Sequence, residues 1–236
     1  MTDPRTPPPL DVLYEDNHLL ALAKPAGIAS AHFQGEEETL DRLVKHYLKT
    51  KYHKPGNVFL GVVHRIDKPV SGVLLFARTS KAAARLSEQF REGTVGKVYW
   101  AVVDGAAVRD AGTLEDWLRK DEGKGRVDVL PPHAAGAKQA ILHYTRRGQH
   151  GPLSLLEVRP QTGRTHQLRV QLAHHGAPIV GDARYGSHHS FGSAIALHAR
   201  SLTFQHPTRP EPITLTADVP ATWRGRFATL LKEAGE

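Results

Sequence analysis

The sequence predicts a mixed fold of strands and helices, in the α/β (α+β) class. Short apolar runs rich in β-branched residues, each bounded by glycine, proline or polar turn residues, indicate strands. Apolar residues also recur at helical spacing in four stretches, which indicates amphipathic helices. The chain has 236 residues, 40% of them hydrophobic, which is enough for a folded core. No repeat and no clear linker interrupts residues 12–236, so one domain is expected.

The N-terminal quarter of the chain begins with a segment that is not expected to form helix or sheet. Residues 1–10 are expected to be disordered or extended, because they include four prolines, which lack the backbone donor that sheets and helices need. The folded domain is assigned to residues 11–236. It begins with a predicted hairpin over 11–23 that leads into a loop at 24–27. An amphipathic helix over 39–52 follows, with a mostly basic polar face.

The middle of the chain alternates strands and helices. Strands are predicted over 58–63, 73–77 and 97–103, the last from its clean alternation. Thr79 or Ser80 can cap a helix that Gly93 ends. The segment 106–137 is polar and punctuated by glycine, so it predicts only short strands and loops. The remaining predicted elements are strands over 140–145 and 153–159 around a loop at 146–152, a helix capped by Thr162 or Thr165 that ends near Gly176, strands over 195–204 and 212–217, and a terminal helix over 221–233.

The charge balance is basic. Lys and Arg number 31 against 24 Asp and Glu, with 15 His, and the formal net charge is +7. Such an excess suits a polyanionic partner, since cations near phosphates release counterions, but it equally fits a merely basic enzyme. The chain has no cysteine, which excludes disulfides and thiolate sites. No apolar stretch approaches a membrane span and no signal peptide opens the chain, so the expected location is the cytoplasm, without membrane contact.

Several classes of metal and catalytic site are disfavoured because their sequence motifs are absent. The histidine pairs at 174–175 and 188–189 are adjacent residues, and neighbours on a helix point in different directions. No H-E-x-x-H is present, so no metal is expected. The chain also lacks a G-x-S-x-G elbow, a P-loop and a G-x-G-x-x-G fingerprint, which argues against a serine hydrolase, an NTPase and a dinucleotide enzyme.

One polar segment between two apolar strands carries the best candidate for chemistry. Asp67 lies in the stretch 61–77 with charged neighbours, where an ordinary turn would use neutral residues. If Arg164 reaches Asp67, it keeps the carboxylate ionised and oriented, although the same pair could simply join two elements. Tyr99 could project into a cleft or pack in a core. The basic side chains nearby suit phosphate contacts, with solvated charge as the alternative.

Five stretches together resemble the RluA family of pseudouridine synthases. Residues 64–77 resemble the family's motif of histidine, arginine, leucine and aspartate, followed by Ser-Gly and an apolar strand, with Ile66 at the leucine position. Residues 24–27 resemble its early loop and 97–101 its tyrosine strand. Residues 163–170 and 178–186 resemble its C-terminal signature. The stretches occur in the family's order, and the resemblance runs from about residue 12 to residue 204, which is most of the chain.

The resemblance implies the pseudouridine synthase fold, a mixed, mostly antiparallel central sheet flanked by helices with an RNA-binding cleft. It also implies an isomerase that converts uridine in structured tRNA or rRNA to pseudouridine, without a cofactor. By position, Asp67 is the catalytic aspartate, Tyr99 packs on the target base and helps remove the C5 proton, and Arg164 partners Asp67. Leu168 lines the base pocket, and Arg65 takes the place of the flipped nucleotide. The other positions expected to bind substrate are His64, Lys24 and Arg169.

The chain departs from the family pattern at residues 68–70, where Lys-Pro-Val replaces the more usual arginine, acidic residue and threonine. Substrate contacts of this loop are therefore the least transferable. The chain also leaves no room for an N-terminal S4-like RNA-binding domain, so a monomer that grips RNA by its catalytic domain, with no obligatory protein partner, is expected. The alternatives are a non-catalytic RNA-binding protein and an aspartate-dependent glycoside hydrolase. The hydrolase is disfavoured because no second acidic residue stands near the motif to act as a partner of Asp67.

Overall fold

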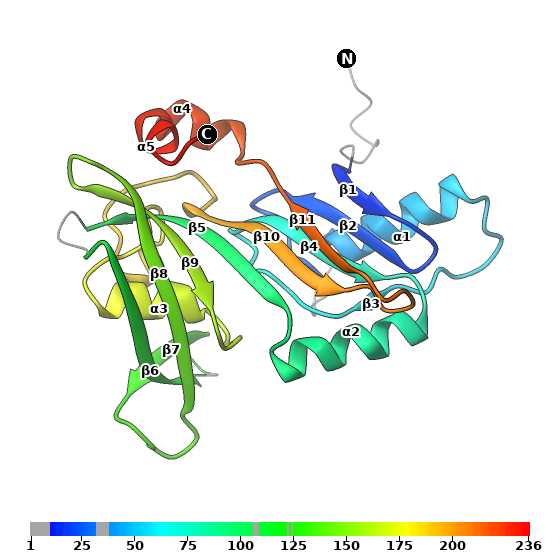
Figure 1. Cartoon of the computed structure of the whole chain (residues 1–236), viewed down its shortest axis with the longest axis horizontal. Helices are drawn as coiled ribbons and strands as arrows, with labels where there is room; N and C mark the ends of the chain where they lie inside the picture. The colour runs from blue at the N-terminus through cyan, green and yellow to red at the C-terminus, as the bar shows by residue number, and fades with distance from the viewer. Residues whose placement is uncertain (1–9, 32–37, 106–108, 122, 124) are drawn as a thin grey trace. The chain divides into compact units, whose positions relative to one another are not determined.

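The computed structural model describes residues 10–31, 38–105, 109–121, 123 and 125–236 (Figure 1). These residues form two compact units. Unit 1 contains the chain up to Val95 together with Ser201–Asp218, and unit 2 contains Gly96–Arg200 together with Val219–Glu236. The arm predicted for residues 1–10 falls almost wholly outside the described residues. The assignment of 11–236 to one catalytic domain stays a prediction.

Unit 1 is built on antiparallel strands. Its strands are β1 (Val12–Glu15), β2 (Leu19–Lys24), β3 (Gly61–Val62), β4 (Ser71–Ala77), β10 (Leu197–Gln205, in unit 1 from Ser201) and β11 (Pro212–Thr216). They follow the order β1-β2-β4-β10, with β3 on β4 and β11 on β10. Every residue of β4 is buried, because strands and α2 cover it. The strand predicted over 58–63 is reduced to the two residues of β3.

Two helices complete unit 1. Helix α1 (Leu40–Lys51) buries an apolar stripe formed by Leu40, Leu43, Val44 and Leu48, as its spacing predicted. Helix α2 (Ser80–Glu92) begins where the Thr79 hydroxyl accepts a hydrogen bond from the Ala82 N–H (3.2 Å). It ends at Gly93, whose φ of 73° favours glycine. Both predicted boundaries of α2 are confirmed.

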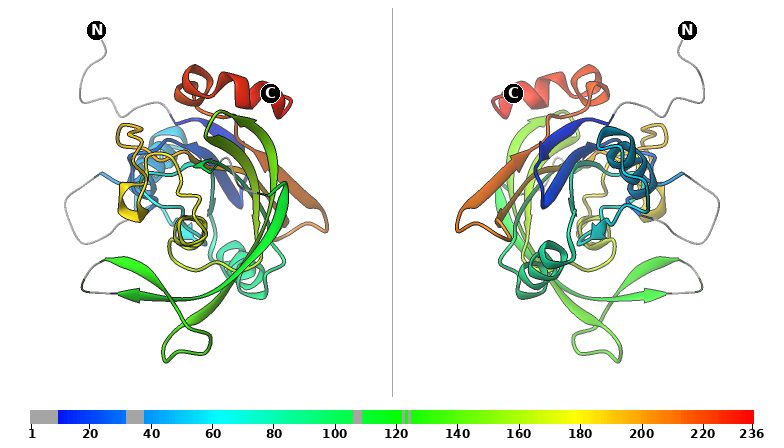
Figure 2. Two further views of the ribbon diagram at one scale, coloured as in Figure 1. Left: turned by 90° about the vertical axis from the view of Figure 1, so that its left-hand side faces the viewer. Right: turned by 90° about the vertical axis from the view of Figure 1, so that its right-hand side faces the viewer.

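Unit 2 is also built on antiparallel strands, with one helix against them. Its strands follow the order β5-β9-β8-β6-β7. They are β5 (Gly96–Asp104), β6 (Ala111–Asp121), β7 (Arg126–Leu130), β8 (Lys138–His150) and β9 (Leu153–Pro160). Figure 2 shows these strands curving around α3 (Gln167–His174), which contacts β6 and β7. A 3-10 turn, η1 (Ala183–Tyr185), and two short helices, α4 (Ala221–Arg226) and α5 (Ala228–Glu233), complete the unit.

Unit 2 contains the largest departures from the predicted elements. The segment 106–137, expected to hold only short strands, contains the 11-residue strand β6, although residues 106–108 lie outside the described part. The loop predicted over 146–152 is wrong, because β8 continues to His150 through a register shift between Arg146 and Gly148. The terminal helix is divided in two at Phe227.

The fold class predicted from the sequence is confirmed, since each strand pair defined by its register is antiparallel and few helices accompany the strands. In the part of the chain that the structure describes, every helix is too short or too polar to span a bilayer.

Candidate active site

Asp67 lies in unit 1 on the segment between β3 and β4, with its side chain half-buried. Its backbone is held on both sides by the segment that follows β2. The Ser30 hydroxyl donates to the Ile66 carbonyl (2.6 Å) and accepts from the Ile66 N–H (3.2 Å). The Gly27 N–H donates to the Lys68 carbonyl (2.8 Å). A further bond from the Val70 N–H to the Asp67 carbonyl (3.0 Å) closes the turn. The carboxylate is thus carried on a fixed backbone.

Lys24, the last residue of β2, is the cation that holds this arrangement together. Its side chain is 1% exposed. The ammonium donates to the carbonyls of Pro25 (2.9 Å), Ile28 (2.7 Å) and Lys68 (3.2 Å). Burial lowers the pKa of Lys24 to about 7, and the Asp67 carboxylate partly offsets that effect. Its donors are used on the backbone that carries Asp67, and the expected contact of Lys24 with substrate stays a prediction.

Replacing Lys24 by methionine is expected to lower kcat by about 100-fold and to cost about 1–3 kcal/mol of stability at neutral pH. The variant leaves the Pro25 and Ile28 carbonyls without the ammonium, and it frees the Asp67 backbone to shift. Activity and denaturant unfolding check this, with Lys54→Met as the control because Lys54 is exposed in the same unit. Equal activity of the two variants would show that Lys24 does not position Asp67.

The same substitution changes how stability depends on pH. The pKa of Lys24 is about 7 in the folded chain against a reference of 10.5, so unfolding takes up a proton between these values. Stability of the wild type relative to Lys24→Met therefore rises as the pH increases through this window, by at most about 1.4 kcal/mol per pH unit. Unfolding curves of both proteins between neutral and alkaline pH measure the difference. A constant difference would contradict the lowered pKa.

The neighbours of Asp67 in the motif face different surroundings. The His64 Nε2 accepts a hydrogen bond from the Leu75 N–H (2.9 Å), and the ring stacks on Phe90 with centroids 4.7 Å apart. His64 is thus engaged inside unit 1, and its contact with substrate stays a prediction. Arg65 is exposed, as a side chain that contacts RNA must be.

In unit 2, Tyr99 occupies the less buried beginning of β5, opposite Val158 of β9. Its ring is half-buried, whereas the strand is fully buried from Trp100 to Val103. Leu168, in the first turn of α3, is half-buried as well. Partial exposure suits a side chain that packs on a substrate base.

Arg164 lies on the segment before α3. The side-chain amide of Gln167, which the sequence patterns did not single out, holds that segment. Arg164 is exposed, and its Nε donates to the Gln139 carbonyl (3.0 Å). The Gln167 Oε1 accepts from the Arg164 N–H (3.0 Å) and from the Thr162 hydroxyl (2.8 Å), and its Nε2 donates to the Ile141 carbonyl (3.0 Å). Neither predicted threonine caps α3, which begins after His166 in a left-handed conformation with φ of 51°.

Arg169 forms a buried ion pair. Its Nε and Nη2 donate to the two carboxylate oxygens of Asp182, at 2.7 and 2.9 Å, and both residues are at most 5% exposed. The guanidinium also lies 5.2 Å from the centre of the Tyr185 ring. The side chain thus anchors α3 to the segment around η1, and the expected contact of Arg169 with substrate stays a prediction.

The expected partners come from both units. Asp67 belongs to unit 1, and Tyr99 and Arg164 belong to unit 2. Each unit holds its own residues on an ordered backbone, and the pairing of Arg164 with Asp67 stays a prediction. Among the described residues no group of three histidine, aspartate or glutamate side chains is placed to hold a metal ion.

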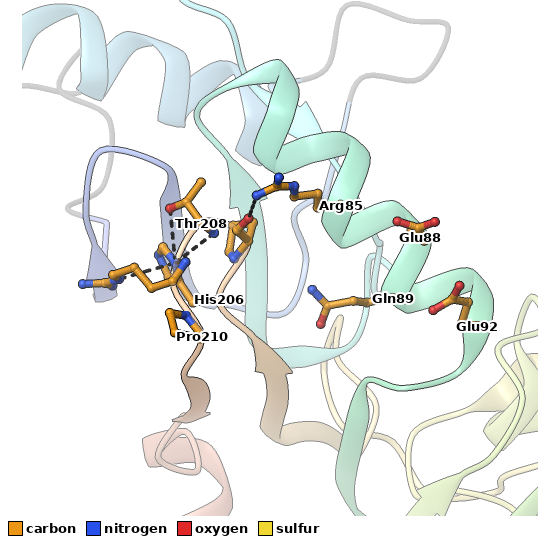
Figure 3. A pocket seen from close by; sticks show the side chains of 9 residues that line it. Arg85, Glu88, Gln89, Glu92, His206, Thr208 and Pro210 are labelled. Atoms are coloured by element: carbon orange, nitrogen blue, oxygen red, sulfur yellow. Dashed lines mark hydrogen bonds between the residues drawn. The ribbon is translucent and has the colours of Figure 1, made fainter.

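A depression of about 530 Å³ in unit 1 lies between α2 and the turn from β10 to β11 (Figure 3). Two arginines and two glutamates line it, namely Arg85, Arg209, Glu88 and Glu92. This balance gives the depression no excess of positive charge that would attract RNA. Arg65, the motif arginine expected at the RNA, is exposed in the same unit.

Comparison with known proteins gives a consistent result. Residues 18–174 match the family model described as RNA pseudouridylate synthase. The chain is 34% identical to an uncharacterised RNA pseudouridine synthase of Bacillus subtilis, over 93% of this chain and 72% of the relative. It is 38% identical to ribosomal large subunit pseudouridine synthase D of Xanthomonas campestris, over 95% and 70%. It is 35% identical to tRNA pseudouridine synthase C of Pectobacterium carotovorum, over 92% of this chain and only 61% of that relative.

A solved structure shares the fold. Human RNA pseudouridylate synthase domain containing 4 superposes with a TM-score of 0.77 at 23% identity, over 95% of this chain and 93% of that chain. At this identity the likeness establishes the architecture, and the sequence relatives carry the family assignment.

Proposed function

The chain belongs to the RNA pseudouridylate synthase family, and from this premise we propose that it isomerises specific uridines in structured tRNA or rRNA. The reaction breaks the bond between N1 of uracil and C1′ of the ribose, turns the base and joins C5 to C1′. The C5 proton is released to water and N1 takes up a proton from solvent, so substrate and product have the same atoms. The reaction is an isomerisation, as the resemblance of the motifs implied.

The geometry around Asp67 is the observation that supports this function best. A half-buried carboxylate stands on a backbone held through Ile66 on one side and Lys68 on the other. An enzyme that attacks an extruded nucleotide needs such a fixed nucleophile or base, because misplacement by about 1 Å costs rate. We assign catalysis to Asp67, with Arg164 as its ionic partner.

The other site residues handle the extruded base. Tyr99 packs on the uracil ring and helps to remove the C5 proton, and Leu168 lines the pocket for the base. Arg65 fills the place that the flipped nucleotide leaves in the RNA. Their partial or full exposure supports these roles.

RNA is the proposed partner in every version of this function. The formal net charge of +7 favours a polyanion, and the names of the relatives include both a tRNA and a ribosomal RNA enzyme. We further propose that the protein works in the cytoplasm as a monomer, without a membrane or an obligatory protein partner.

The test uses unmodified tRNA and ribosomal RNA transcripts labelled with tritium at uridine C5. Release of tritium to water is expected from one class of transcript, followed by mapping of pseudouridine to a defined position. Binding of both classes without any release would favour a non-catalytic RNA-binding protein on the same scaffold.

A further inference from the structure

Lys97, the second residue of β5, differs from the other lysines that are not exposed. Three described lysines are not exposed, and two of them have partners. Lys24 donates to three carbonyls, and Lys45 lies 3.5 Å from the Asp41 carboxylate. Within the described residues, no hydrogen bond or ion pair engages the Lys97 ammonium. Burial lowers the pKa of Lys97, and no nearby charge acts on it. The side chain carries the cost of burial without a compensating contact.

Open space borders this ammonium. A Cβ placed on Gly163 would lie 3.9 Å from the Lys97 Nζ and would meet no other heavy atom within 4 Å outside its chain neighbours. The space lies beside two proposed site residues of unit 2. Arg164 follows Gly163 directly, and Tyr99 shares the face of β5 with Lys97, because alternate residues of a strand point the same way.

A part-buried cation next to an open space is suited to an anion. RNA offers one such group at every nucleotide, since its backbone phosphates are charged and uracil is neutral at physiological pH. We propose that Lys97 binds a backbone phosphate of the RNA next to the target uridine, in the space that the absence of a side chain at Gly163 leaves open. This assignment rests on the proposed function, because it takes RNA as the ligand. A contact of this kind fixes the position of the strand and carries no sequence preference.

The first test compares Lys97→Met with Lys232→Met, which removes the same charge from an exposed position on α5. The probe is a fluorescein-labelled unmodified transcript of the class that the wild type binds more tightly. The Lys97→Met variant is expected to bind about tenfold more weakly and to lower the slope of log Kd against log salt by about 1, whereas Lys232→Met behaves as the wild type. Lys97→Arg is expected to recover most of the affinity.

The second test fills the space without changing charge. Gly163→Ala adds one methyl group at ordinary contact distance from Lys97, and Gly225→Ala, which meets nothing within 4 Å, is its control in the same unit. Gly163→Ala is expected to weaken RNA binding severalfold with an unchanged melting temperature, because the methyl group occupies the position of the phosphate. Gly225→Ala is expected to bind as the wild type does.

A structural role for Lys97 predicts the opposite pattern, namely a lower melting temperature of Lys97→Met with unchanged affinity and salt slope. That result, or equal binding by Lys97→Met and Lys232→Met, would overturn the inference. The tritium assay separates its failure from that of the proposed function. If the wild type releases tritium and the Lys97 variants bind normally, only the phosphate site is wrong. If the binding differences appear without any tritium release, only the isomerase is wrong.

Discussion

Replacing Asp67 by asparagine is expected to reduce tritium release by at least about 10⁴-fold, with little change in stability or RNA affinity. Asparagine has nearly the size of aspartate but neither its charge nor its basicity, so it can act neither as nucleophile nor as base. The bonds from Ser30 and Gly27 reach the backbone of Ile66 and Lys68, and the substitution leaves these bonds intact. Single-turnover release on the transcript that the wild type modifies measures the effect.

The matched control is Asp128→Asn, which removes a carboxylate from β7 whose partner is the part-exposed Arg126 (3.0 Å). It is expected to retain wild-type rates. Melting temperature and RNA binding of both variants show whether the folded protein is intact. Residual activity of Asp67→Asn within tenfold of the wild type would assign the chemistry to a different group.

Breaking the buried pair of Arg169 and Asp182 is expected to have the largest effect on stability. Arg169→Met leaves the Asp182 carboxylate, 2% exposed, without its bidentate partner, which typically costs about 3–5 kcal/mol. Denaturant unfolding measures the loss. Arg159→Met is the control, because its pair with Glu157 leaves the Arg159 side chain 62% exposed and contributes at most about 1 kcal/mol.

A double variant, Arg169→Met with Asp182→Asn, tests the physical cause. Once the unpaired charge is removed as well, the double variant is expected to be more stable than Arg169→Met alone. If Arg169→Met costs less than about 1 kcal/mol, the pair does not anchor α3.

Local sequence patterns predicted the helices whose boundaries and buried faces depend on residues close in the sequence. The boundaries of α2 follow from Thr79 and Gly93, and the stripe of α1 follows from its spacing. By contrast, β8 runs through a polar segment expected to be a loop. Its strand conformation there depends on pairing with β9, where the Arg147 guanidinium also contacts Glu157 (2.7 Å). Such pairing is tertiary, and no local pattern encodes it.

The candidate site shows the same limit for charged residues. The sequence shows that Lys24 and Arg169 are cationic, but it does not show whether they are buried. Both were therefore expected to contact RNA. Their partners are the backbone carbonyls of a loop and an aspartate 13 residues away, which only the folded chain brings together. Gln167 and Gln171 are both buried and spaced four residues apart on α3. That spacing indicates a buried polar face, but Leu168 and Leu172 have the same spacing and predict an apolar face instead.

Unit 1 is built from two segments that are far apart in the sequence, and this arrangement affects its folding during synthesis on the ribosome. Its apolar core joins Leu19 and Leu75 to Leu202, Phe204 and Leu215. The chain that carries Asp67 is therefore made early, but its core is completed only when the strands of residues 201–218 emerge. Until then, the apolar surface that β10 and β11 will cover remains exposed, where it can cause aggregation or bind chaperones. Deletions that remove β11 should accordingly prevent folding of the N-terminal residues, although the two segments are nearly the whole chain apart in sequence.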